Sequence, residues 1–572
     1  MKNNILKYLY GYKKEAILGP LFKLLEAIFE LIVPIIVADI IDNGNTFNYV
    51  FIRFLILFAL ALIGLVCSIT AQYFSAKAAV CFSSKVRQVL FDKIQYLDFY
   101  GLDEEGTSTL INRMTNDVNQ VQTGVNLVLR LFLRSPFVVF GAMIMAFTIS
   151  VKIAYIFILA IIILSLIVFG IMLISIPLYK KVQSKSDKLL SLTRENLIGV
   201  RVLRAFNQEE TERNNYEKHN KSLTKEQKFV GNISQAMNPL TYVCINFMII
   251  LLIKMGAVEV NTGNLSQGNV IALYNYMSQI LVELIKLANL IIQLTKAFAS
   301  KHRIESILDT QNTLIEKDIQ NNFDESKPII SFKNVSMRYP KNKQDSLSNI
   351  SFDIYQGQTL GIIGGTGSGK STLVSLIPHF YDATSGGVEY KGINVQNIDS
   401  ALLRDKIGIV MQKGTVFSGT IKENLLIGKS DATEEEIIKV LKDSQSYDFV
   451  FSKKEGINYL VEQNGRNLSG GQIQRLSIAR ALIKKPDILI FDDSQSALDY
   501  KTDSLLRQAL KELSYNPTQI IVSQRTSSIM HADKIIVLDN GNMVGYGTHD
   551  ELMQNCKIYQ EIYHSQYKGG AK

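Results

Sequence analysis

The stretch GGTGSGKST, residues 364–372, follows the apolar run TLGII and precedes residues with apolar side chains at helical spacing. Glycine lets successive backbone N–H groups turn toward one anion, and the amino terminus of a helix adds a favourable dipole. A strand, a glycine-rich turn and a helix in this order therefore predict a phosphate-binding loop. The loop consists of Gly364, Gly365, Thr366, Gly367, Ser368, Gly369, Lys370, Ser371 and Thr372.

Three side chains at or near this loop have the chemistry to bind a magnesium nucleotide. Lys370 is expected to reach the β- and γ-phosphates of ATP, and the Ser371 hydroxyl is expected to bind Mg²⁺. Asp492 ends the apolar run ILIF, where a carboxylate can complete the Mg²⁺ shell. An Asp after a buried strand is more often a loop cap, but its place downstream of a phosphate-binding loop favours the metal-ligand interpretation.

From Ile329 onward, short β-rich runs alternate with helical patterns. The runs are PIISFKNVSM, TLGIIG, KIGIVM, DILIFD, TQIIVS and KIIVLD. This alternation predicts an α/β P-loop domain with a mainly parallel sheet. The polar stretch 311–328 has the composition of a linker, so we expect an ATP-binding domain over 329–572 and a separate domain over 1–310.

The amino-terminal part carries six apolar stretches, each near the ~20 residues that a spanning helix needs. They are 16–41, 50–74, 125–149, 152–177, 239–260 and 270–297. The two long connections, 75–124 and 178–238, also have apolar residues at helical spacing, so the spanning helices are expected to extend beyond the bilayer. The sequence thus predicts a multidomain protein, in which an all-α polytopic transmembrane domain precedes the α/β domain.

Lys and Arg are concentrated in the two long connections, whereas the short segments DNGNTFN and NTGNLSQGN contain neither. The positive-inside rule therefore puts the long connections, both termini and the ATP-binding domain in the cytoplasm. The formal net charge of +9 is explained by these basic flanks and the anionic headgroups of the lipid bilayer. We expect no nucleic-acid partner.

Ionisable side chains inside apolar spans are functional candidates, because their burial in lipid is costly. Three glutamates have this position: Glu26, Glu30 and Glu283. They are candidates for lining a substrate cavity, and this role is weighed against local pairing with neighbours such as Lys23 and Lys286. Arg134, near the cytoplasmic end of the third span, is expected to snorkel toward the interface.

The segment LSGGQ directly precedes the helical pattern IQRLSIARALI, so its backbone offers a second anion site at a helix amino terminus. Its residues are Leu468, Ser469, Gly470, Gly471 and Gln472. The chain resembles the ABC transporters over essentially its full length, with LSGGQ as the family signature, GGTGSGKST as Walker A and ILIFDD as Walker B. The resemblance implies an ATP hydrolase coupled to transport, with ATP and Mg²⁺ as cofactors.

The resemblance also implies roles for further residues. Tyr339 sits where the family stacks an aromatic ring on adenine, although alone it would be an ordinary strand tyrosine. Gln412 matches the glutamine that senses Mg²⁺ and the transmembrane domain, and 496–499 match the D-loop, which ends in Asp499. Nucleotide sites of this family form when two cassettes meet head to tail, so LSGGQ and Asp499 would serve the partner's site.

Two positions depart from the family pattern. Asp493 stands where the family has the Glu that acts as general base, and Gln524 stands where it has a His. Asp is one methylene shorter, and a misplacement of about 1 Å can slow catalysis on the order of 10²-fold. Gln can hydrogen-bond the γ-phosphate but cannot carry the charge of an imidazolium. Together the changes predict a degenerate site that binds ATP and hydrolyses it slowly; conservative drift in a slow but competent site is the alternative.

An intact LSGGQ beside these altered positions suits a heterodimer, because the signature serves the partner's ATP. The pattern resembles the bacterial heterodimeric multidrug ABC exporters. It implies a second, non-identical half-transporter as partner and alternating-access export of amphipathic small molecules across the cytoplasmic membrane. The alternatives are a lipid or peptide translocator of the same fold and a non-transporting, ATP-binding membrane sensor. Six spans disfavour a soluble ABC ATPase that acts on ribosomes or DNA.

Overall fold

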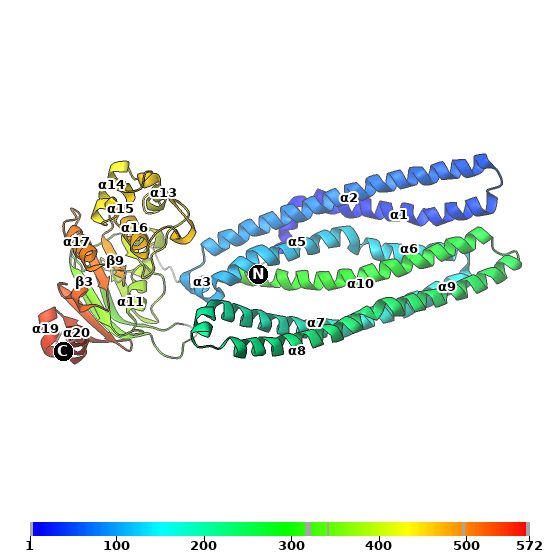
Figure 1. The fold of residues 1–572 in the computed structure, drawn as a ribbon. Helices are drawn as coiled ribbons and strands as arrows, with labels where there is room; N and C mark the ends of the chain where they lie inside the picture. The colour runs from blue at the N-terminus through cyan, green and yellow to red at the C-terminus, as the bar shows by residue number, and fades with distance from the viewer. Residues whose placement is uncertain (1–3, 315–321, 340–341, 495–497, 568–572) are drawn as a thin grey trace. The chain divides into compact units, whose positions relative to one another are not determined.

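The computed structural model describes residues 4–314, 322–339, 342–494 and 498–567. It divides into two compact units (Figure 1). The first comprises Met1–Tyr96 and Glu105–Thr310, and the second comprises Leu97–Glu104 and Gln311–Lys572. The first unit is helical and the second is α/β, in the order that the sequence predicts.

Long helices make up the first unit (Figure 1). Its elements are η1 Ile5–Tyr12, α1 Lys13–Asn43, α2 Phe47–Gln95, α4 Thr107–Asn112, η2 Arg113–Asp117, α5 Val118–Leu127, η3 Val128–Phe132, α6 Arg134–Ile149, α7 Val151–Ala205, α8 Glu209–Gln235, α9 Met237–Asn261 and α10 Gln267–Asp309. The helices α2 and α7 continue without a break into the two long connections, which confirms the predicted helical extensions.

Five helical stretches among the described residues are long and apolar enough to cross a membrane. They are Phe47–Gln95, Thr107–Ile149, Val151–Ala205, Glu209–Asn261 and Gln267–Asp309. The helix α1 carries the first predicted span but falls outside this set, because charged side chains from Lys23 to Asp39 interrupt its apolar residues. The polytopic helical architecture is therefore present, with one span more polar than the other five.

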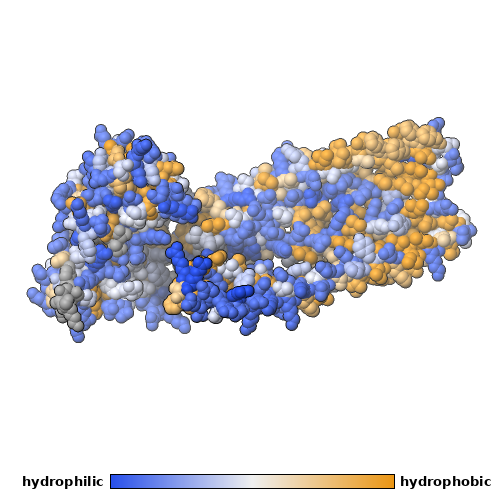
Figure 2. All heavy atoms as spheres, in the orientation of Figure 1, coloured by the Kyte–Doolittle hydropathy of each residue, from blue (hydrophilic) through white to orange (hydrophobic). Residues whose placement is uncertain are grey.

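Hydrophobic side chains gather over the half of the first unit that holds the α1–α2 and α9–α10 connections (Figure 2). On α2, for example, Phe51, Phe54 and Phe58 are exposed. Exposed apolar surface on this scale is typical of lipid contact. Inside the bundle, small residues such as Ala27 and Ala142 are fully buried, so the helices can approach closely.

The second unit is built on a ten-stranded sheet of order β5-β4-β1-β2-β12-β11-β3-β10-β9-β6. The strands are β1 Ile330–Met337, β2 Leu347–Ile354, β3 Thr359–Gly364, β4 Ser385–Tyr390, β5 Ile393–Asn394, β6 Ile407–Val410, β9 Ile488–Asp492, β10 Thr518–Val522, β11 Lys534–Asp539 and β12 Asn542–Gly547. The neighbours β11, β3, β10, β9 and β6 are parallel, as predicted. The pairs among β1, β2, β4 and β5 are antiparallel, so a second, antiparallel part accompanies the parallel one.

Helices cover this sheet, and a short ladder of β7 Gly419–Thr420 and β8 Leu460–Val461 lies apart from it. The helices are α3 Phe99–Glu105, α11 Lys370–Leu376, α12 Ser400–Asp405, α13 Ile421–Leu426, α14 Glu434–Asp443, α15 Tyr447–Phe451, α16 Gly470–Leu482, α17 Tyr500–Lys511, α18 Thr526–Ile529, α19 His549–Asn555 and α20 Lys557–Tyr567. The strands β9 and β10 are buried throughout, as strands covered on both faces are. Parallel strands end at one edge of a sheet, so the segments after β3, β6, β9 and β10 come together there.

The segment Leu97–Glu104 belongs to the second unit although it follows α2 in the chain. The Phe99 ring stacks on Phe380 with the ring centroids 4.1 Å apart, and the Tyr381 hydroxyl donates to Asp103 at 2.6 Å. The carboxylate of Asp98 accepts hydrogen bonds from Gly101 N at 2.7 Å, from Thr313 Oγ1 at 2.8 Å and from Thr313 N. One buried carboxylate thus ties the start of α3 to the residues that follow α10.

Candidate functional site

The glycine-rich loop after β3 has the backbone that a phosphate cradle requires. Gly367 and Gly369 have φ angles of +82° and +98°, in the left-handed region that favours glycine. A Cβ at Gly369 would lie 2.6 Å from the Ser346 carbonyl oxygen and 2.8 Å from Leu347 Cδ2. The loop can therefore begin α11 at this point only with glycine in that position.

Lys370, the first residue of α11, folds back over the loop. Its Nζ donates to the carbonyl oxygens of Gly364 at 2.9 Å and Gly365 at 2.7 Å. Burial lowers the pKa of Lys370, and the negative charges of Asp493 and Asp492 oppose that shift. The ammonium lies at the loop, where it can exchange carbonyl oxygens for phosphate oxygens.

An open pocket of about 680 Å³ adjoins this loop, and Gly367, Gly369 and the start of α11 contribute to its wall. Tyr339 lies beside the loop, with its hydroxyl 3.3 Å from Thr372 Oγ1 and its ring edge-on to Tyr381. Inward-turning backbone, a lysine and an adjacent aromatic ring fit a nucleoside triphosphate.

A hydroxyl and a carboxylate that suit Mg²⁺ meet at the same sheet edge. Ser371 Oγ donates to Asp492 Oδ1 at 3.1 Å. Burial raises the pKa of Asp492, the hydrogen bond from Ser371 lowers it, and the negative charge of Asp493 raises it again. Mg²⁺ prefers such oxygens together with phosphates and water, so these residues would hold the ion, which would neutralise phosphate charge when bound.

Asp493 follows β9 in the left-handed region, with φ of +47°, and its backbone N–H donates to Val522 O at 3.0 Å. Its Oδ2 accepts hydrogen bonds from Gln524 Nε2 at 3.2 Å and from Gln412 Nε2 at 3.4 Å. Burial raises the pKa of the Asp493 carboxyl, and the charge of Lys370 and the donor Gln524 oppose that shift. The structure therefore brings together the two positions at which the sequence departs from the family pattern.

The signature segment forms the beginning of α16. Ser469 Oγ accepts from Gln472 N at 3.3 Å, and Gln472 Oε1 accepts from Ser469 N at 2.9 Å, which is a reciprocal cap. Asp499 caps α17 by accepting from Thr502 N at 2.9 Å and Thr502 Oγ1 at 2.8 Å. Ser496 and Ala497 of the D-loop lie outside the described residues.

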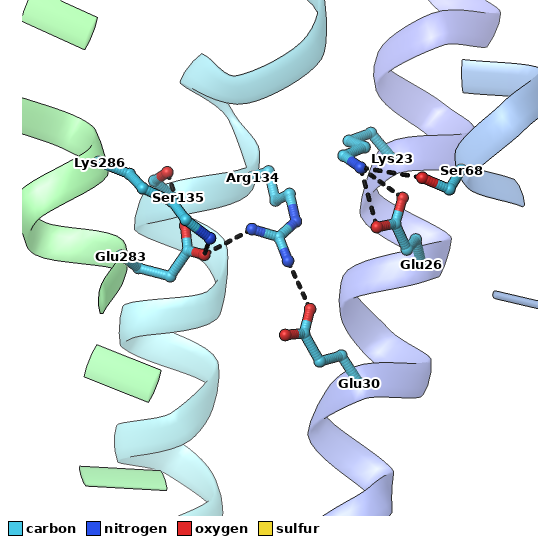
Figure 3. A network of polar contacts seen from close by, with 8 residues as sticks. All are labelled: Lys23, Glu26, Glu30, Ser68, Arg134, Ser135, Glu283 and Lys286. Atoms are coloured by element: carbon cyan, nitrogen blue, oxygen red, sulfur yellow. Dashed lines mark hydrogen bonds and ion pairs between the residues drawn. The ribbon is translucent and has the colours of Figure 1, made fainter. Parts of the chain in front are cut away.

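In the first unit, the three glutamates singled out in the sequence belong to two groups of polar contacts (Figure 3). Lys23 Nζ pairs with Glu26 within α1 and lies 3.4 Å from Ser68 Oγ of α2. Glu30 and Glu283, from α1 and α10, are joined through a third helix, because Arg134 at the start of α6 contacts both at 2.5 Å.

The expectation that Arg134 snorkels is wrong. Its side chain is 8% exposed and paired with two carboxylates that are 104 and 149 residues away in the chain. The two carboxylates compensate the charge of the guanidinium, so Arg134 can lie inside the bundle. Its place near a helix end had suggested an interfacial position instead. Sequence reasoning missed this central role because both partners are distant in the chain.

Comparison with known proteins identifies both units. Residues 16–284 match the family described as ABC transporter transmembrane region, and residues 347–496 match the family described as ABC transporter. The chain is 34% identical, over 98% of both proteins, to the uncharacterized ABC transporter ATP-binding protein YfiB of Bacillus subtilis (strain 168). This chain belongs to the ABC transporter family.

Other ABC transporters show the same extent of similarity. The putative multidrug export ATP-binding/permease protein YgaD of Bacillus subtilis (strain 168) is 32% identical, with 98% of this chain and 97% of that protein covered. A solved bacterial Atm1-family ABC exporter with ATP bound superposes with a TM-score of 0.83 at 21% identity, covering 98% of this chain and 99% of the other. The predicted fold class, a helical transmembrane domain followed by a P-loop ATP-binding domain, is confirmed.

Membership of this family establishes the coarse function. This ABC transporter is a multi-pass membrane protein whose ATP-binding domain couples ATP hydrolysis to transport, with Mg²⁺ as the usual companion of the nucleotide. The transmembrane half contacts the lipid bilayer and the transported substrate.

Proposed function

We propose that this chain is one half of a heterodimeric ABC exporter and that its own nucleotide site holds ATP and hydrolyses it slowly. The observation that carries this proposal is the contact of Gln524 and Gln412 with one oxygen of Asp493. In this arrangement a short carboxylate is held by neutral amides of its own chain, and the site lacks the cation that a histidine would supply. Such a site retains nucleotide without positioning water well.

The residues that bind nucleotide have distinct roles in this proposal. Backbone N–H groups of 364–372 and the Lys370 ammonium hold the phosphates, and Tyr339 stacks on the adenine ring. Ser371, Asp492 and Gln412 hold the Mg²⁺ ion. Asp493 and Gln524 occupy the base and switch positions, where they orient the site but accelerate hydrolysis little.

The signature segment, residues 468–472, serves a second and non-identical half-transporter. The reciprocal cap of Ser469 and Gln472 fixes the start of α16, so backbone donors are preorganised for an anion that arrives from outside the chain. With Asp499, this segment would complete the fast site on the partner's Walker motifs. Turnover there, and not at Lys370, would reset the cycle.

Alternating access completes the proposal. Residues 1–310 would form the transmembrane domain, 311–328 the linker and 329–572 the cassette, with both termini in the cytoplasm of a bacterial cell. The contacts of Asp98, Phe99 and Asp103 within the second unit support a role for α3 in passing cassette movement to α2 through the chain. Export of amphipathic small molecules is supported by the name of the relative YgaD.

A pair of variants tests the proposal. The full-length chain is co-purified with the partner half-transporter, and ATP hydrolysis and ATP-dependent dye uptake into inverted vesicles are measured. We expect Ser469→Arg to abolish hydrolysis and dye uptake, because it blocks the partner's site, and Lys370→Ala to leave most of the turnover. Fast hydrolysis by this chain alone, abolished by Asp493→Asn, would overturn the heterodimer. If both variants change ATP hydrolysis as expected but the wild-type protein takes up no dye, the non-transporting, ATP-binding membrane sensor would be favoured instead.

A further inference from the structure

A pocket of about 410 Å³ lies between α1 and α10 in the first unit. The side chains of Glu30 and Val33 contribute the α1 wall, and Val282 and Lys286 are among the residues of the α10 wall. Charged and apolar groups therefore face the same space. Glu283 also lines the pocket, and its ion pair with Arg134 is almost completely buried.

The pocket lies at membrane depth. The carboxyl end of α1 and the amino end of α10 lie side by side, because Gly268 N donates to Asp42 Oδ1 at 2.8 Å. Glu30 and Glu283 are each about 15 residues from those ends, which corresponds to about 20–25 Å of helix at 1.5 Å per residue. A hydrocarbon core is about 30 Å thick, so a charge here lies inside the core, about 5–10 Å from its opposite face.

The four charges at this pocket balance. Glu283 accepts from Arg134 at 2.5 Å, from Ser135 Oγ at 2.8 Å and from Lys286 at 2.9 Å. Glu30 accepts from Arg134 through Oε2 only. Two carboxylates and two cations sum to zero, so a ligand with net charge would bring an uncompensated charge into the membrane.

Two of these groups are accessible from the pocket. The side chain of Glu30 is 41% exposed and that of Lys286 is 48% exposed, whereas those of Arg134 and Glu283 are 8% and 3% exposed. A carboxylate has a second oxygen, and an ammonium has three donors. The pocket thus presents one anion and one cation, each with capacity for a further partner.

We infer that this pocket binds a zwitterionic amphipathic substrate. Its ammonium group contacts Glu30, its carboxylate or phosphate contacts Lys286, and its apolar part packs on Val33 and Val282. A net-neutral ligand satisfies both accessible charges and preserves the balance of the pocket. The inference names a substrate class for the proposed exporter and rests on that function.

Binding to the full-length protein in nanodiscs tests this inference without ATP turnover. Four radiolabelled probes are compared at pH 8: N-dodecylglycine, dodecylamine, dodecanoate and lysophosphatidylethanolamine. We expect at least one zwitterionic probe to bind about tenfold more tightly than the cationic and anionic ones. Preference for lysophosphatidylethanolamine would assign the pocket to a lipid headgroup, and preference for N-dodecylglycine would assign it to a free amphipath.

Two charge variants give a readout that misfolding would not mimic. Glu30→Gln should shift the preference toward dodecanoate, and Lys286→Gln should shift it toward dodecylamine. Lys152→Gln is a matched control, because Lys152 pairs with Glu259 outside the pocket, and it should leave the ranking unchanged. Equal affinity for all probes, or an unchanged ranking in both pocket variants, would overturn the inference. The Ser469→Arg and Lys370→Ala results would stand in that case, because they test the cassette alone.

Discussion

Gln524 Nε2 donates to Asp493 Oδ2 at 3.2 Å, so the two residues that depart from the family pattern contact each other. The contact has a consequence for catalysis. An amide that is already hydrogen-bonded to the carboxylate orients it toward β10, and the carboxylate is shorter than the family's glutamate. The effects of changing Asp493 and Gln524 on the rate of ATP hydrolysis are therefore expected to be coupled and not additive.

Restoring both positions should restore hydrolysis. The double variant Asp493→Glu with Gln524→His should raise turnover by the purified chain on the order of 10²-fold, because the carboxylate recovers about 1 Å of reach and is released from the amide of Gln524, whose place a group able to carry positive charge takes. Each single change should give much less than half of that gain on a logarithmic scale. The measurement is phosphate release, with Asp493→Asn as the inactive control. Additive gains from the two single variants would contradict the coupling.

Gly369→Ala should destabilise the unliganded cassette. Its Cβ would clash with the Ser346 carbonyl oxygen and with Leu347, and its φ of +98° disfavours any side chain. Gly365→Ala is the matched control, since its Cβ would meet no atom within 4 Å. We expect a clearly lower Tm for Gly369→Ala without nucleotide, because backbone strain lowers the free energy of unfolding by about 1–2 kcal/mol and the clash lowers it further. Equal Tm values for the two variants would contradict the loop geometry.

Arg134→Gln should destabilise the helical unit. Removing one partner of a buried ion pair leaves an uncompensated charge and costs about 3–5 kcal/mol. The double variant Arg134→Gln with Glu283→Gln should lose less than the sum of the two single variants, which a double-mutant cycle on Tm measures. Lys152→Gln breaks an ion pair whose lysine is 71% exposed and serves as the control, with little expected effect on Tm because solvent screens an exposed pair.

Asp98→Asn should loosen α3 within the second unit. Burial alone would raise the pKa of Asp98, but hydrogen bonds from Gly101 N and from Thr313 outweigh it and lower the pKa below its usual 3.8. A carboxyl with a lowered pKa stabilises the folded state above its unfolded-state value, and this stabilisation is lost as pH falls through the folded-state pKa. The protection factors of the α3 amides in the wild type, which correct for the intrinsic pH dependence of exchange, should therefore change little from pH 7 to pH 5.

Hydrogen exchange of 99–105 at pH 7 measures the effect of the variant, and faster exchange is expected. Asp92→Asn, at an exposed position near the end of α2, is the control and should leave the exchange unchanged. Substrate-stimulated ATP hydrolysis should fall in Asp98→Asn while basal hydrolysis persists. Unaltered exchange in Asp98→Asn would show that the carboxylate does not hold α3.

Local sequence patterns predicted much of this molecule. The run TLGII followed by glycines and Lys370 determines strand, loop and helix within one short segment, so its geometry follows from neighbouring residues. Asp492, Asp493 and Gln524 were grouped through the resemblance to the ABC transporters, and the structure brings them together because parallel strands end at one edge. Arg134 could not be placed, since its two partners lie on other helices. The particular partner of α3, Phe380, was equally hidden, because a short helix in a long connection has no local sign of which side chain it packs against.

The unbroken length of α2 has a mechanical consequence. Its 49 residues correspond to a rod of about 74 Å at 1.5 Å per residue. If such a rod pivots by about 5° at one end, the other end travels about 6 Å, roughly the pitch of one helical turn. The chain reaches α3 only a few residues after α2 ends. A small tilt of α2 about its amino-terminal end, at the α1–α2 loop, would therefore displace Phe99 by several ångströms.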